Sequence, residues 1–151
     1  MNPKETPMFS ALLQSTIERH GFDTVDAAGL DVYAQAREHV VLFFPGDAVR
    51  LAESDDVAVV LPELIKVFGD RITPAVVPRD SERELQRRYR FNAFPALVFL
   101  RNGQYLGVLQ RILDWGDYLE QIPEILSREV SDPPPFAFPE HCVASAPGLQ
   151  Q

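Results

Sequence analysis

The segment Phe94-Pro95-Ala96-Leu97-Val98-Phe99-Leu100-Arg101-Asn102-Gly103 decides the fold of this 151-residue chain. Its apolar run from Ala96 to Leu100 predicts a β-strand, because short continuous apolar runs bounded by turn residues are typical of buried strands. Asn102-Gly103 predicts a tight hairpin turn. We therefore expect Tyr105 to Leu109 to return as the antiparallel partner of this strand.

Helical and strand patterns alternate through the rest of the chain. Val40 to Phe44 is wholly apolar and ends at Pro45-Gly46, which predicts a central strand buried on both faces of a sheet. A helix from Val57 contains Pro62 and must therefore bend or start late. The other predicted elements are a helix at 8–20 closed by Gly21, a strand at 24–25, a helix capped by Asp26, a strand at 72–77, a helix at 81–90 with a Ser/Asp cap, and a last helix capped by Asp114. This order predicts an α/β fold with a mixed sheet flanked by helices.

Length and composition limit the number of domains and the kinds of partner that we expect. The length predicts one domain, residues 1–130, followed by a proline-rich, flexible tail at 131–151. With 14 Lys and Arg against 22 Asp and Glu, the formal net charge is −8, so a basic peptide is a better partner than nucleic acid or an anionic membrane. No apolar run reaches the roughly 18 residues of a membrane span, and no secretory signal pattern opens the chain. A cytoplasmic protein is expected.

The element order, the proline-bearing helix and the segment around Pro95 resemble the thioredoxin fold over about residues 22–128. The resemblance implies a three-layer α/β/α sandwich with a mixed central sheet, here with an extra N-terminal helix, and a cis peptide bond before Pro95. It also places Ser54-Asp55-Asp56-Val57 where thioredoxins carry their Cys-x-x-Cys dithiol. Both sulfurs are missing, the central strand has no buried carboxylate, and Arg111 stands where a glycine usually faces the active site. A redox-inactive protein is therefore expected.

A narrower resemblance covers residues 8–128. It rests on the leading helix, the acidic segment after Val41-Leu42, the run Arg90-Phe91-x-x-Phe94-Pro95, and Tyr105-x-Gly107-Val108-Leu109 with Trp115. Together these features resemble the HupG/HyaE family of [NiFe]-hydrogenase expression proteins. This resemblance implies a non-catalytic assembly chaperone that needs no cofactor. The implied partner is the precursor of the hydrogenase small subunit with its twin-arginine signal peptide.

The candidate partner-binding residues lie at the predicted open end of the sheet, where ligands of α/β proteins tend to bind. The acidic members can hold arginine side chains bidentately, although Asp55 and Asp56 can equally serve only to stabilise a helix N-terminus. Phe94 and Pro95 are expected to form the second wall, with Phe94 either gripping apolar residues of a partner or packing under the helix that begins near Asp56. The full set is Asp47, Glu53, Ser54, Asp55, Asp56, Phe94 and Pro95.

Two other functions stay open. Cys142, the only cysteine, could act as a monothiol in a redox protein, although the sequence supplies no nearby cation to lower the pKa of its thiol. Alternatively, the chain could be a structural subunit that stays on the mature hydrogenase. A metal site is not expected, since His141 and Cys142 alone do not supply four ligands. Trp115 is expected to anchor the edge of the core.

Overall fold

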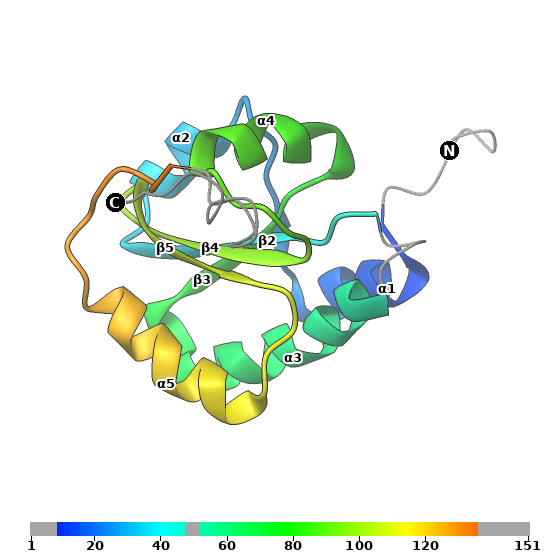
Figure 1. Ribbon diagram of the computed structural model, residues 1–151. Coiled ribbons are helices and arrows are strands. Elements are labelled where there is room, and N and C mark those ends of the chain that lie inside the picture. Colours follow the sequence, from blue (N-terminus) through cyan, green and yellow to red (C-terminus); the bar gives the residue numbers. More distant parts are fainter. Residues whose placement is uncertain (1–8, 48–51, 136–151) are drawn as a thin grey trace, which may run out of the picture.

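The computed structural model describes residues 9–47 and 52–135, which form a mixed five-stranded sheet with helices on both faces (Figure 1). The strands, in sheet order, are β1 (Asp23–Thr24), β3 (Thr73–Val76), β2 (His39–Phe44), β4 (Ala96–Arg101) and β5 (Gln104–Gln110). The helices are α1 (Ala11–His20), α2 (Leu30–Gln35), α3 (Ala52–Phe68), the 3-10 turn η1 (Gly69–Arg71), α4 (Arg79–Tyr89) and α5 (Trp115–Leu126). β1, β3 and β2 are parallel, whereas β4 is antiparallel to both β2 and β5. The predicted thioredoxin-like sandwich is confirmed.

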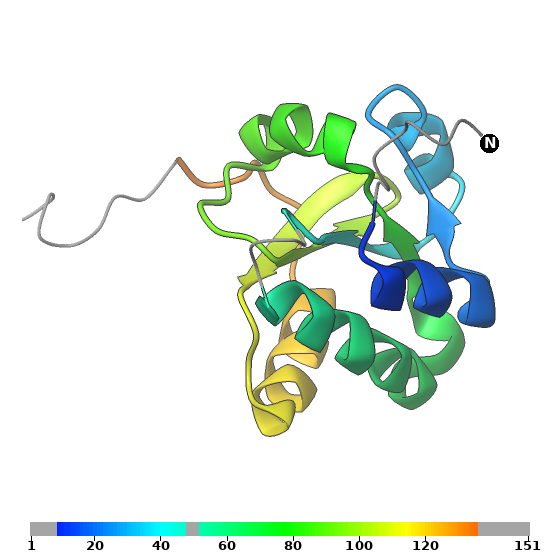
Figure 2. The same cartoon turned by 90° about the vertical axis from the view of Figure 1, so that its right-hand side faces the viewer.

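Two apolar cores lie on opposite faces of the sheet. Helices α1, α3 and α5 cover one face, and α2 and α4 cover the other (Figures 1 and 2). Along β2, Val41 and Phe43 join the first core, while Val40, Leu42 and Phe44 join the second. Successive strand side chains point to opposite faces, which is why a central strand needs an unbroken apolar run.

Several local predictions are confirmed. β2 is the central strand, and the Asn102-Gly103 turn has φ of 49° and 87°, the positive values that a type I′ hairpin requires at both positions. α1 ends at Gly21, whose φ of 67° is left-handed. The Phe94–Pro95 peptide bond is cis.

The starts of three helices differ from the predictions. Asp26 does not cap α2, because its carboxylate accepts a hydrogen bond from Gly29 N (2.8 Å) and closes the turn that precedes the helix. α4 begins at Arg79, and Ser81 does not cap it, because the hydroxyl of Ser81 instead accepts a bond from Ala27 N (3.0 Å). α3 already includes Ala52, five residues before Val57, so Pro62 lies well inside the helix. In each case the pattern identified the helix but not the residue at which it begins.

The chain continues beyond α5 onto the edge of β5. Arg128 donates to Leu106 O (3.3 Å), and Ser131 N donates to Tyr105 O (3.1 Å). Arg90 then binds Pro133 O (3.0 Å). The first residues of the predicted tail therefore cover backbone groups of the edge strand, which limits pairing with other strands. None of the helices in the described part of the chain is long and apolar enough to cross a membrane.

Candidate functional site

The candidate site lies at the end of the sheet where β2 and β3 finish and β4 begins. Phe44, the last residue of β2, pairs with Ala96, so the cis-proline loop lies beside the end of the central strand. Helices α3, α4 and α5 all begin at this end, since each follows a strand that ends there. Their positive N-termini favour acidic side chains, which explains much of the local concentration of carboxylates.

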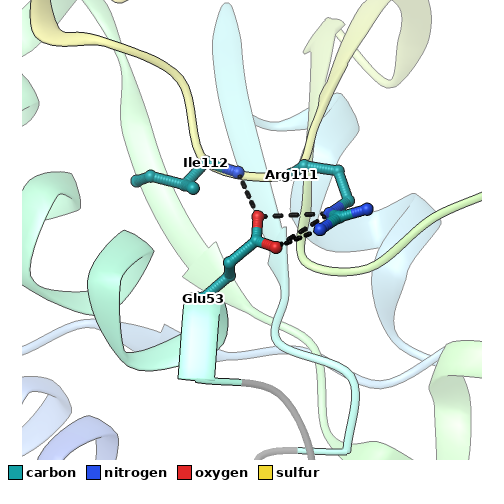
Figure 3. A network of polar contacts seen from close by, with 3 residues as sticks. All are labelled: Glu53, Arg111 and Ile112. Atoms are coloured by element: carbon teal, nitrogen blue, oxygen red, sulfur yellow. Dashed lines mark hydrogen bonds and ion pairs between the residues drawn. The ribbon is translucent and has the colours of Figure 1, made fainter.

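An ion pair between Glu53 and Arg111 connects α3 with the segment that follows β5 (Figure 3). The Arg111 guanidinium binds the Glu53 carboxylate through both Nε, at 3.0 and 3.1 Å, and Nη2. Glu53 also accepts a hydrogen bond from Ile112 N (3.0 Å). This pairing with Arg111 lowers the pKa of Glu53 and raises that of Arg111. Glu53 is therefore engaged within the chain.

Arg111 also contacts the cis-proline loop. Its φ is 67°, a left-handed value that is uncommon for a residue other than glycine. Its backbone N donates to Pro95 O at 2.7 Å. Arg111, which stands where thioredoxins usually have a glycine, thus connects the start of α3 to Pro95. Its guanidinium binds Glu53, and its backbone N binds Pro95 O.

The residues at the position of the missing dithiol point in different directions. Ser54 is fully buried, and its hydroxyl has no hydrogen-bond partner. Asp55 accepts a bond from Ser10 Oγ (2.7 Å), so it ties the leading helix to α3. Asp56 is exposed to solvent. Of the three, only Asp56 therefore presents a carboxylate that is both exposed and outside the described hydrogen bonds.

Glu82 supplies a buried carboxylate that the sequence patterns did not single out. It extends from α4 and accepts hydrogen bonds from Gly46 N (2.7 Å) and Arg79 Nη1 (3.1 Å), while its side chain is only 2% exposed. Burial raises the pKa of Glu82, and the charge of Asp47 raises it further. Glu82 thus holds the end of β2 in place just before Asp47. Its spacing from Arg79 was the only signal in the sequence, and that spacing predicts a surface ion pair.

Phe94 lies on the α4 side of the sheet, so the alternative in which it packs under α3 is wrong, while the alternative in which it grips apolar residues of a partner stays a prediction. It is half-buried and packs against Phe91, with ring centroids 5.3 Å apart in an edge-to-face arrangement, on the α4 side of the sheet. It does not pack under α3, whose buried residues belong to the opposite core. Gln110 accepts bonds from the backbone N of Asn92 (2.7 Å) and Ala93 (2.8 Å) and so orders this loop.

The described residues offer binding groups in place of a thiol. Cys142 and His141 lie outside them, so the monothiol hypothesis stays a prediction. Within residues 9–47 and 52–135, no three His, Cys, Asp or Glu side chains are grouped to hold a metal ion. Trp115 differs from its prediction, since 42% of its surface is exposed at the start of α5.

Comparisons with known proteins point to one family. The sequence profile described as hydrogenase-1 expression protein HyaE matches residues 12–118. The chain is 46% identical over 135 residues to the hydrogenase expression/formation protein HoxO of Azotobacter vinelandii, covering 88% of this chain and 90% of that protein. It is 42% identical over 127 residues to HupG of Rhizobium leguminosarum bv. viciae, covering 82% and 85% respectively. The crystal structure of a putative HupG from Rhodopseudomonas palustris CGA009 is 43% identical, covers 70% of this chain and 95% of that one, and has a TM-score of 0.50.

Proposed function

Because this chain belongs to the HyaE family of hydrogenase expression proteins, we propose that it is a non-catalytic assembly chaperone in the maturation of a [NiFe] hydrogenase. Its proposed partner is the small-subunit precursor with its twin-arginine signal peptide. The proposed place of action is the cytoplasm, before the precursor is exported.

A binding role is supported by the side chains that occupy the position where thioredoxins have their dithiol. Ser54 is buried there, and the bridge from Glu53 to Arg111 stands between the start of α3 and the cis-proline loop. A thiol-exchange reaction needs an accessible thiolate, and these side chains supply none. The same end of the fold presents exposed carboxylates, including Asp56, to which arginine side chains of a partner can bind.

Purification of the tagged full chain from cells that produce the hydrogenase tests this proposal. The proposal predicts that the small subunit recovered with it retains its signal peptide. Recovery of only the processed, mature small subunit would overturn it and favour a structural subunit. A Cys142→Ser chain serves as the control, because it is expected to recover the same amount of precursor.

A further inference from the structure

Exposed apolar side chains concentrate on one layer of the molecule. Among the described residues, the large apolar side chains at least one-third exposed are Leu12, Val32, Val59, Val67, Trp115, Leu119 and Val130. Four of these seven lie on α3 or α5, which are side by side below the sheet in both views (Figures 1 and 2). The opposite layer, formed by α2 and α4, contributes only Val32. The α3–α5 layer is therefore the candidate interaction surface.

One row of α3 faces α5. Glu53, Val60 and Val67 are seven residues apart, which is about two helical turns, so they lie on the same side of the helix. Glu53 bonds to Arg111 and Ile112, in the segment that leads into α5. Val60 and Val67 therefore point towards α5 as well, and Val67 remains 50% exposed.

A matching row lies on the side of α5 that carries Ile122, which lines one small pocket together with Leu61, Leu64 and Ile65 of α3. Trp115, Leu119 and Leu126 follow each other at spacings of four and seven residues. Leu126 borders a hollow of about 390 Å³ that also touches Arg71, in the turn that follows α3. The two rows thus form an apolar seam, made of the exposed Val67, Trp115 and Leu119 and of Val60 and Leu126, which are partly buried against the core. From Trp115 to Leu126 it runs about 16 Å, at about 1.5 Å per residue.

On the α5 side of the seam the charges are negative. From Asp114 to Ser127 the chain has four carboxylates and no Lys, Arg or His. Glu124 is paired with Arg128, whereas Asp114 occupies the N-cap position of α5 without a side-chain capping bond. Asp56 lies in the first two turns of α3 and is exposed. The seam therefore complements a segment that has apolar residues along its length and arginines at the end near Asp56 and Asp114.

We infer that this seam binds the apolar stretch of the twin-arginine signal, with its arginines at the Asp56–Asp114 end. The inference rests on the proposed function and adds the surface that performs it. It moves the apolar contact away from Phe94, which packs on the other face of the sheet.

Trp115 is the only tryptophan of the chain, so its fluorescence reports directly on the seam. The full chain is titrated with a synthetic twin-arginine signal peptide from a [NiFe]-hydrogenase small subunit, by calorimetry and by fluorescence in parallel. Binding is expected to shift Trp115 emission to shorter wavelength and to reduce its quenching by acrylamide. A Val67→Ser, Leu119→Ser chain is expected to bind roughly tenfold more weakly or worse. Val32→Ser is the matched control on the opposite layer and is expected to bind normally.

The outcomes separate this inference from the proposed function. Calorimetric binding without a change in Trp115, or with equal affinity in the seam variant, would overturn the inference and leave the proposed function standing. No binding of the peptide or of the full precursor would defeat both. A dimer that buries Trp115 without peptide would assign the seam to a second copy. Greater quenching of Trp115 in a Phe136→Ser, Phe138→Ser chain would assign the seam to the protein's own tail. Either result would overturn the inference.

Discussion

Glu82 gives the sharpest test of what stabilises the end of the sheet where the candidate site lies. In Glu82→Ala, the buried Gly46 N–H loses its acceptor, which costs about 1–3 kcal/mol, and the loss of one buried methylene adds about 0.8 kcal/mol. Relief from burying a charge offsets part of this cost. We expect the free energy of unfolding to fall by about 2–3 kcal/mol. In Glu82→Gln the amide oxygen still accepts from Gly46, so the loss at pH 7 is expected to stay below about 1 kcal/mol.

The pH dependence of the same residue has a defined sign. Because burial raises the pKa of Glu82 in the folded chain, the native state keeps this proton to a higher pH than the unfolded state does. The contribution of Glu82 to stability is therefore fully present below its ordinary pKa of 4.5 and is lost as the pH rises through the folded value. Glu82→Gln is expected to remove this decline.

Urea denaturation followed by circular dichroism, repeated between pH 4 and pH 8, measures both effects. Glu84→Ala is the matched control, since Glu84 is exposed on the same helix and its loss is expected to change stability by less than about 0.5 kcal/mol. The reasoning is refuted if Glu82→Ala is no less stable than Glu84→Ala, or if the wild-type chain and Glu82→Gln show the same pH dependence.

Three other substitutions test separate features of the chain. A Cβ on Gly107 would lie 2.7 Å from Arg128 Nη1, which ends a flexible side chain that can move aside, so Gly107→Ala should lower the free energy of unfolding by less than about 1 kcal/mol in urea denaturation; a loss of several kcal/mol would contradict this. Ser10→Ala removes both the α1 cap and the bond to Asp55 and should cost about 1–2 kcal/mol by the same assay, whereas a loss near zero would mean that α1 docks without them. Cys142→Ser should leave calorimetric affinity for the signal peptide unchanged, and a large loss would revive a role for the thiol.

The sequence predicted the parts of the fold that depend on local chemistry. The apolar run of β2, the Asn102-Gly103 turn and the helix stop at Gly21 each follow from residue types that permit few alternatives. The family resemblance supplied the cis bond before Pro95 and the overall layer order.

The candidate site was less predictable, because its contacts join residues distant in sequence. Glu53 and Arg111 are 58 positions apart, and Asp55 meets Ser10 across 45 positions. Periodicity cannot show that such carboxylates are already engaged, so they looked equally available to a partner. The exposure of Trp115 depends on how α5 is rotated against the sheet, which its residue type alone does not specify.

The most direct test of a chaperone that recognises the export signal is calorimetric titration of the full chain with the twin-arginine signal peptide. A second peptide carries two lysines in place of the two arginines, because lysine keeps the charge but cannot bind a carboxylate with two parallel hydrogen bonds. Our account predicts binding of the first peptide and weaker binding of the second. Failure of the full chain to bind either peptide would contradict it.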